Sequence, residues 1–361
     1  MIRLSKHQLF ALMFIFEVGS TTLFALGIEA KQDAWIVILL ALLIGIILVW
    51  IYTELQNAFP DKNYVDIAIA ILGNKLGIPY VLLTTLGYFW HCARNLREFG
   101  ELIIITTLPE AKLWFINSIF VLVSLYALIK GIEVLARASE VVIPIIIVFI
   151  IGLYILVYLS GDIEISNLTP VLGGGIGPII KTLPEVSVFP FGEMFVFLMY
   201  WNYAGEKRIV RKTAIKTVIL SGILLCFTVL MDISVLGAKY TSLATIPLLE
   251  TVRVVNIGNI ITNIDSIAII IIFLGGFFKM SIYLNAVALA FSSLFKVSNY
   301  KLVLVVITAI LLWFSLAFES SYAFHKWLFP FDTQYFGIVY TNITPLLLLM
   351  IYKIKKKRIN F

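Results

Sequence analysis

The chain has 361 residues, of which 61% are hydrophobic and 13% are charged, and its mean hydropathy is +1.02. This composition excludes an ordinary soluble domain and predicts a polytopic membrane protein, because about 20 consecutive apolar residues cross a bilayer. The formal net charge of +6 would suggest nucleic acid as a partner in a soluble protein. Here membrane topology explains the basic residues better, and no nucleic-acid partner is expected.

About ten apolar runs follow one another, joined by short polar connections. They lie at about 9 to 30, 34 to 55, 80 to 108, 113 to 130, 138 to 159, 183 to 203, 213 to 236, 264 to 291, 300 to 318 and 335 to 352. The first run is expected to remain as a span, because it is too long for a signal-peptide core and no A-x-A site follows it. We therefore predict a single transmembrane domain over residues 1–361.

The basic residues favour one orientation. With a cytoplasmic N-terminus, the inner segments hold eighteen Lys and Arg residues and the outer segments hold six. Both termini are then expected to be cytoplasmic. The inner set includes Lys207, Arg208, Arg211, Lys212 and Lys216, and the tail residues Lys353, Lys355, Lys356, Lys357 and Arg358.

Three connections are longer than the rest. Residues 57–79 predict a short helix lying at the cytoplasmic interface. Residues 160–182 and 237–263 are outer connections that carry glycine and proline. The first is glycine-rich, but a structured loop is favoured over a phosphate-binding loop, because no strand precedes it and no Lys-Ser or Lys-Thr pair follows.

Two runs are interrupted at mid-depth. The first has Gly19, Ser20, Thr21 and Thr22 at its midpoint, and the sixth has Pro190, Phe191, Gly192 and Glu193. Because the two runs point in opposite directions and each opens a set of five, they predict an inverted 5+5 repeat, at about 9–159 and 183–352. Half-helix ends in such a fold leave N–H and C=O groups free to bind a small zwitterion or ion. Proline kinks without a ligand are the alternative.

Charged side chains inside the runs need a partner or a purpose, since a charge at a helix centre costs roughly 2.5 to 3.5 kcal/mol on insertion scales. In the third run, Arg94 is four residues from Glu98, and Arg97 is four residues from Glu101. This spacing predicts two ion pairs on one helix face, directed into the bundle. A structural role is favoured over one in gating or coupling.

Lys279 has no acidic residue three or four positions away in its own run. It is expected to pair with an acid on another helix, either Glu193 or Glu17, or to lose its proton. A cation-substituting or ligand-contacting role, a structural salt bridge and snorkelling to the interface all remain open.

Metal-binding and catalytic arrangements are not indicated. His7, His91 and His325 are scattered, and Cys92 and Cys226 both lie in apolar runs. Neither a metal cluster nor a Ser-His-Asp or Cys-His arrangement is suggested. We expect no cofactor, no metal and no enzymatic activity.

One outer segment carries a family resemblance. NLTPVLGGGIGPI at 167–179 resembles the N-L-x-P-V-L-G-x-G-x-G-P-I signature of the B subunits of bacterial spore germinant receptors (GerAB type), in the amino acid-polyamine-organocation superfamily. The resemblance covers essentially the whole chain. Supporting pieces are Gly19, Gly87-Tyr88-Phe89, the phenylalanine-rich break in the sixth run, and Asp265-Ser266 leading to Phe277-Phe278.

The resemblance implies an all-α, ten-span, leucine-transporter-like fold with spans 1 and 6 broken. It also implies a small-molecule germinant, such as an amino acid, recognised in the spore inner membrane together with an A-type subunit and a lipoprotein C-type subunit. By similarity the pocket is lined by Gly19, Ser20, Thr21, Thr22, Tyr88, Cys92, Phe191, Gly192, Glu193, Lys279 and Tyr283.

Two departures from the family pattern concern the ligand. Thr21 stands where a second glycine is common, and Glu193 and Lys279 make the pocket more charged than a simple aliphatic amino acid requires. We therefore expect a nutrient-sensing subunit whose ligand the sequence does not name. The alternatives are an autonomous proton-coupled amino-acid transporter, in which Glu193 or Lys279 titrates, and an ion channel or scaffold in which the breaks serve only packing.

Overall fold

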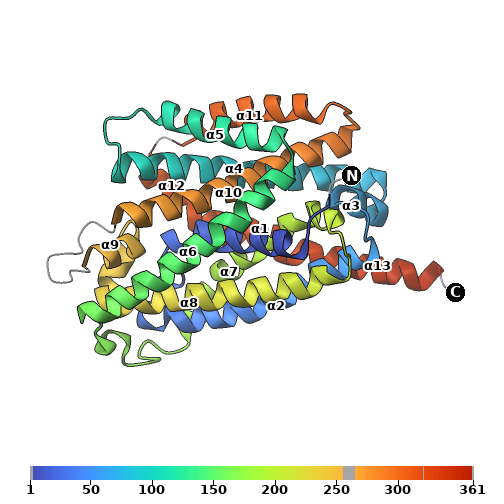
Figure 1. The fold of residues 1–361 in the computed structure, drawn as a ribbon. Helices are drawn as coiled ribbons and strands as arrows, with labels where there is room; N and C mark the ends of the chain where they lie inside the picture. Colours follow the sequence, from blue (N-terminus) through green and yellow to red (C-terminus); the bar gives the residue numbers. More distant parts are fainter. Residues whose placement is uncertain (1–2, 255–264, 320, 360–361) are drawn as a thin grey trace.

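The computed structural model describes residues 3–254, 265–319 and 321–359, and every regular element in these ranges is a helix (Figure 1). An isolated parallel bridge joins Leu4 to Ala204. The side chains of residues 265–267 and 357–359 lie outside the described part. The predictions on Asp265, Ser266, Lys357 and Arg358 therefore fall outside it too.

The first half of the chain forms six α-helices and two 3-10 helices. They are α1 (Lys6–Gly19), η1 (Thr21–Leu23), η2 (Ile28–Asp33), α2 (Ala34–Ala58), α3 (Tyr64–Leu72), α4 (Asn74–Thr106), α5 (Leu113–Ile129) and α6 (Ile132–Ser160). Local sequence fixes two of their starts. Ser5 and Gln8 form a capping box before α1, and the Asn63 side chain accepts the Asp66 N–H before α3. The predicted short helix within 57–79 is confirmed as α3.

The second half contains longer and more irregular elements. They are η3 (Ile165–Leu168), α7 (Gly177–Val188), η4 (Phe191–Met199), η5 (Trp201–Tyr203), α8 (Ile209–Leu243), α9 (Pro247–Val254), α10 (Asp265–Phe295), α11 (Tyr300–Ala317), α12 (Tyr322–Phe331), the π-helical η6 (Asp332–Ile343) and α13 (Thr344–Ile359).

Several predicted boundaries were wrong, among them the starts of α4, α6, α7 and α12 and the end of α8. The sixth run begins at Gly177 rather than at about 183, because Pro178 occupies the first turn of α7, where a missing N–H costs nothing. The last run begins with α12 at Tyr322 rather than at about 335. Polar residues such as His325 and Lys326 lowered the hydropathy there, although His325 is buried inside the bundle.

Seven helices of the described part are long and apolar enough to span a membrane. They lie at Ile28–Ala58, Ile132–Ser160, Gly177–Met199, Ile209–Leu243, Ala268–Phe295, Tyr300–Ala317 and Tyr322–Lys356, and the apolar α5 is shorter. Their exposed surfaces carry large apolar side chains such as Ile151, Leu220 and Trp313. The chain is an integral membrane protein.

The helices pack in layers around a central group (Figure 1). α2 lies along α8 at one side, and α5 lies along α11 at the other. Between them α10 packs against both α1 and α4, and every residue of η4 is buried. The 3-10 element η4 therefore occupies the interior, where neighbouring helices surround it.

Two glycines allow α1 and α10 to pack closely against each other. A Cβ added to Gly275 would lie 2.2 Å from the Gly19 Cα, and one added to Gly19 would lie 2.4 Å from the Gly275 Cα. Small residues at such a crossing let two backbones touch inside a membrane. This contact lies at the last residue of α1, next to the interruption.

Replacement of Gly275 by alanine is expected to destabilise the fold by at least about 1 to 3 kcal/mol, because the new methyl group meets backbone atoms that have no flexible way to move aside. Thermal unfolding in detergent measures the effect. Gly152→Ala in α6 is the control, since nothing lies within 4 Å of its added Cβ. Equal melting temperatures for the two variants would contradict the proposed close contact.

Candidate functional site

The α-helical geometry of the first run stops at the predicted position. α1 ends at Gly19, residues Thr21–Leu23 form a single 3-10 turn, and Phe24 is extended. The Thr21 hydroxyl donates to the carbonyl of Glu17 at 2.5 Å. The side chains of Glu17, Ser20 and Thr21 are all buried, so this polar turn faces the bundle interior.

The sixth run changes geometry in a similar way. α7 ends at Val188, Phe189 is extended, and η4 begins at Phe191 after Pro190. The Tyr52 hydroxyl of α2 lies 2.6 Å from the carbonyl oxygen of Thr341 and 3.3 Å from that of Gly192. Gly192 has no room for a side chain, since an added Cβ would lie 2.5 Å from Thr341 Oγ1. η4 is therefore held tightly between α2 and η6.

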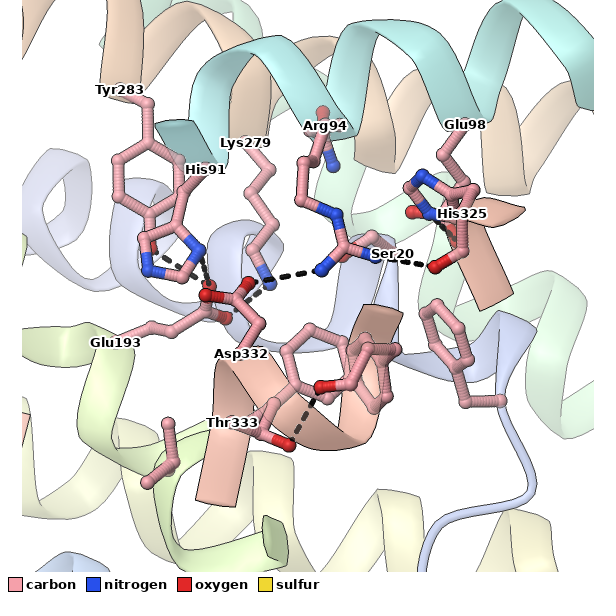
Figure 2. Close-up of a pocket in the computed structure, with 15 residues that line it drawn as sticks. Ser20, His91, Arg94, Glu98, Glu193, Lys279, Tyr283, His325, Asp332 and Thr333 are labelled. Carbon is pink, nitrogen blue, oxygen red and sulfur yellow. Dashed lines mark hydrogen bonds and ion pairs between the residues drawn. The ribbon is translucent and has the colours of Figure 1, made fainter. Parts of the chain in front are cut away.

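A small cavity of about 50 Å³ lies where these elements meet α4, α10 and α12 (Figure 2). Its wall mixes charged, polar and aromatic side chains. The lining residues are Ser20, Phe24, His91, Arg94, Asn95, Glu98, Val188, Phe189, Glu193, Lys279, Tyr283, His325, Phe329, Asp332 and Thr333. Since one water needs about 10 to 15 Å³ by this measure, the space suits a group of only a few atoms.

Lys279 and Glu193 form a buried ion pair in the wall. The Lys279 Nζ lies 2.5 Å from Glu193 Oε2, and the two residues are 2% and 5% exposed. The Tyr283 hydroxyl donates to Glu193 Oε1 at 2.8 Å, and His91 Nδ1 lies 3.8 Å from that oxygen (Figure 2). The predicted pairing of Lys279 with an acid on another helix is confirmed, and the acid is Glu193.

Aromatic rings complete the surroundings of the ammonium group. The Lys279 Nζ lies 4.3 Å from the centroid of the Phe189 ring and 5.1 Å from that of Phe16. Phe24, Phe189 and Phe329 contact one another, with centroids 5.2 to 5.4 Å apart. Phe24 follows η1, Phe189 lies between α7 and η4, and Phe329 lies in α12. The three rings form one wall of the cavity.

Glu17 does not pair with Lys279. Its Oε2 accepts a hydrogen bond of 3.2 Å from the Ser221 hydroxyl of α8. Its Oε1 is buried without a hydrogen-bond partner among the described residues. Glu17 lies outside the cavity lining, so it is a second buried carboxyl group beside the site.

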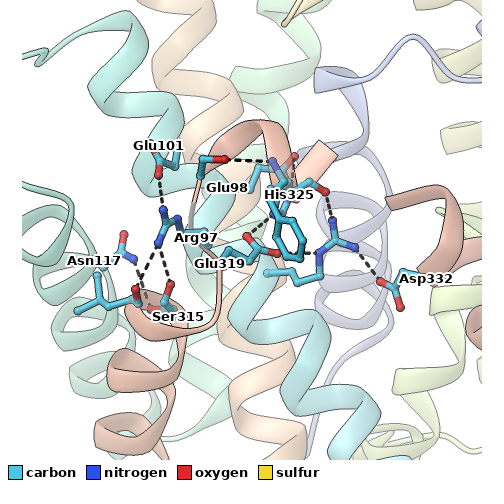
Figure 3. A network of polar contacts seen from close by, with 12 residues as sticks. Arg97, Glu98, Glu101, Asn117, Ser315, Glu319, His325 and Asp332 are labelled. Atoms are coloured by element: carbon cyan, nitrogen blue, oxygen red, sulfur yellow. Dashed lines mark hydrogen bonds and ion pairs between the residues drawn. The ribbon is translucent and has the colours of Figure 1, made fainter. Parts of the chain in front are cut away.

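Of the two ion pairs predicted on α4, the structure contains one. Arg97 Nη2 lies 2.7 Å from Glu101 Oε1, as the spacing predicts (Figure 3). The predicted pair of Arg94 with Glu98 was wrong, because Arg94 reaches across to two other carboxylates instead. It lies 3.0 Å from Asp332 and 3.5 Å from Glu319.

The Arg94 partners were missed because they follow α11 in a stretch predicted to lie outside the bundle. Arg94 Nη2 also donates to the His325 carbonyl at 2.8 Å, and His325 Nδ1 lies 2.7 Å from Glu319 Oε2. All three partner residues are buried. One feature of the sequence could have indicated these partners. Glu319 and His325 stand among aromatic residues, where an uncompensated charge would be costly.

Four of the predicted pocket residues line the cavity: Ser20, Glu193, Lys279 and Tyr283. The other seven are buried beside it and pack elsewhere. Gly19 contacts Gly275, Phe191 packs on Gly45, Cys92 Sγ lies 3.4 Å from the Met280 carbonyl, and Tyr88 packs among Phe195, Tyr283 and Tyr340. Thr21, Thr22 and Gly192 complete this group.

The charges of the cavity wall are largely paired. Lys279 is held by Glu193, and Arg94 is held by Asp332 and Glu319. Among the described residues no group of three or more His, Cys, Asp or Glu could hold a metal ion.

Comparison with known proteins gives a consistent result. A family model described as "Spore germination protein" matches residues 3–323. Spore germination protein KB of Bacillus subtilis (strain 168) is 34% identical over 299 residues, which cover 82% of this chain and 80% of that protein. Spore germination protein YndE of the same organism is 27% identical over 309 residues, 82% of this chain and 81% of that protein.

Solved structures share the fold at low sequence identity. MhsT in complex with L-phenylalanine matches with a TM-score of 0.70 and 14% identity, over 97% of this chain and 88% of that one. MHP1, a nucleobase-cation-symport-1 family transporter, matches with a TM-score of 0.65 and 16% identity, over 91% and 74%. The described part of the chain thus has an all-helical fold of the leucine-transporter type.

Removal of one partner of the Lys279–Glu193 pair is expected to cost about 3 to 5 kcal/mol of folding stability, because the other charge is left buried and alone. We expect Lys279→Met and Glu193→Gln each to melt well below the parent, and the double variant to recover part of the loss. Glu54→Gln, at the half-buried Arg211–Glu54 pair, is the control, expected to change stability by about 0 to 1 kcal/mol. Additive single losses in the double variant would argue against the pairing.

Proposed function

Because this chain belongs to the spore germination protein family, we propose that it is the nutrient-sensing subunit of a germinant receptor. The family and the fold are those of receptors and transporters rather than enzymes. In this proposal a small molecule, such as an amino acid, binds in the cavity at the Lys279–Glu193 pair. The complex also contains an A-type subunit and a lipoprotein C-type subunit, and it resides in the spore inner membrane.

The observation that carries the proposal is the polar cavity inside an apolar bundle. Charged residues within membrane-spanning helices are costly and mark binding or transport sites by default. Here Lys279, Glu193 and Arg94 share the wall of a cavity that five separate parts of the chain enclose. A cavity of this size and polarity supports binding of a small ligand rather than packing alone.

Ligand binding would act by shifting a conformational equilibrium. The cavity wall contains the end of α1, α4, the α7–η4 junction, α10 and α12. A ligand that contacts all five stabilises whichever arrangement brings them together, by as much as its affinities for the two states differ. The partner subunits then respond to that arrangement.

We further propose ten spans in an inverted 5+5 repeat, with spans 1 and 6 broken. α1, α4 and α5 would join the seven long apolar helices: α1 and α5 are short, and α4 carries the Arg94 to Glu101 charges that lower its hydropathy. The change from α to 3-10 geometry after both Gly19 and Val188 supports the broken spans.

An autonomous proton-coupled transporter is the second candidate. It is favoured by the buried carboxyl group of Glu17 beside the Lys279–Glu193 pair, since buried acids of this kind relay protons in transporters. Adjacent reading frames for an A-type subunit and a lipoprotein would favour the receptor. Uptake of labelled nutrient by this chain alone in vesicles would favour the transporter.

Direct binding to the full chain in lipid nanodiscs, measured over a panel of amino acids and sugars, tests the proposed site. We expect Tyr283→Phe to weaken binding of any ligand found by about tenfold, because Glu193 loses a charge-assisted hydrogen bond worth about 1.5 to 3 kcal/mol. The control is Tyr335→Phe, at an exposed tyrosine of η6. Unchanged affinity in the Tyr283 variant would place the ligand elsewhere.

The proposed orientation, with both termini cytoplasmic, can be read from single-cysteine labelling. A cysteine at Lys31 is expected to react with a membrane-impermeant maleimide in intact cells, and one at Lys212 only after permeabilisation. Both positions are exposed, whereas the native Cys92 and Cys226 are buried and give little background. The reverse labelling pattern would invert the topology.

A further inference from the structure

Seven side chains of the cavity wall have a buried polar atom without a hydrogen-bond partner among the described residues. Lys279 Nζ, Glu193 Oε2 and Arg94 Nε lie in ion pairs instead, which leaves His91 Nε2 and three acceptor atoms. Ser20 Oγ, Asn95 Oδ1 and Glu98 Oε1 are buried without a hydrogen-bond partner, and the residues are 1%, 6% and 6% exposed. A buried acceptor left unpaired is costly, so native proteins rarely retain several together without a reason. All three atoms can accept a hydrogen bond, which points to a ligand that donates.

The charges of the cavity wall also favour a ligand that donates hydrogen bonds. Lys279 is matched by Glu193 at 2.5 Å, and Arg94 is matched by Asp332 at 3.0 Å. Glu98 has no lysine or arginine partner in the part of the chain that the structure describes. Its nearest ion-pair contact is His325 Nε2 at 3.8 Å, beyond hydrogen-bond distance.

His325 is already engaged by another acid. Its Nδ1 lies 2.7 Å from Glu319 Oε2, and the same Glu319 lies 3.5 Å from Arg94. One imidazole therefore stands between two carboxylates and leaves the Glu98 side of the cavity with an excess of negative charge. Figure 2 shows Glu98 and His325 separated from the Glu193, Lys279 and His91 group by the Arg94 side chain.

We propose that Glu98, Asn95 and Ser20 form a subsite for a protonated amine. An ammonium group has three donors and no acceptor, which matches three unpaired acceptors, one of them an uncompensated carboxylate. The volume of about 50 Å³ limits the ligand to a small amine-bearing molecule. This inference rests on the proposed function, in that it names the chemistry that the same cavity selects.

Matched pairs of ligands that differ only in amine against hydroxyl test the subsite. The probes are glycine with glycolate, L-alanine with L-lactate, and ethanolamine with ethylene glycol, titrated against the full chain in lipid nanodiscs. We expect at least one amine to bind at least tenfold tighter than its hydroxyl partner. We also expect Glu98→Gln to weaken that amine at least tenfold and to reduce the preference over the hydroxyl compound.

Glu101→Gln is the matched control, because it removes a carboxylate one turn further along α4 that pairs with Arg97 and lies outside the cavity. Ser20→Ala is a second, smaller change that keeps the test usable if Glu98→Gln folds poorly. It is expected to weaken the amine several-fold and leave the hydroxyl compound unchanged.

Two results separate this inference from the proposed function. Equal binding of amines and hydroxyl compounds, or an unchanged amine affinity in Glu98→Gln and Ser20→Ala, overturns the amine subsite and leaves the sensing site standing. Absence of binding by every amine also overturns the subsite. The proposed function falls with it only if the wider panel of amino acids and sugars fails to bind as well.

Discussion

The fold depends on the ion pair between Lys279 of α10 and Glu193 of η4, at 2.5 Å inside the bundle. Neither charge can be left alone in a membrane interior, so α10 and η4 must face each other in one register. The 3-10 geometry that begins after Pro190 places Glu193 on this face. Tyr283 and the Phe189 ring then hold the pair from two further directions. The stabilising contact thus lies in the wall of the cavity that we propose as the ligand site.

A second polar network lies beside the first and ties α4 to the chain that follows α11. Arg94 forms ion pairs with Asp332 and Glu319. His325 lies within hydrogen-bond distance of Glu319 (Figure 3). Because Arg94 and Asp332 both line the cavity, the two networks share one wall. A change in the position of α12 would therefore disturb both the packing of α4 and the shape of the cavity. This coupling is the physical basis on which a small ligand could alter the arrangement of the bundle.

Packing around the site is as restrictive as its electrostatics. Gly19 and Gly275 bring α1 and α10 into backbone contact, and Gly192 is enclosed by Thr341. Interiors packed this closely respond to a ligand by changing between discrete arrangements rather than by gradual deformation. The residues that the family resemblance implied for the pocket therefore fall into two groups. Those at the close contacts support the cavity, while Ser20, Glu193, Lys279 and Tyr283 face it.

The sequence alone determined the membrane class, most helix positions, the ends of α1 and α7, and a cross-helix acid for Lys279. These follow from hydropathy, from glycine and proline, and from the cost of a lone buried charge, all of which act locally. Only the tertiary structure decided which acid Lys279 meets, that Arg94 bypasses Glu98 for Asp332, and that Asn95 faces the cavity. Arg94 and Asp332 are 238 positions apart, and no local pattern specifies how two such distant helices are rotated against each other.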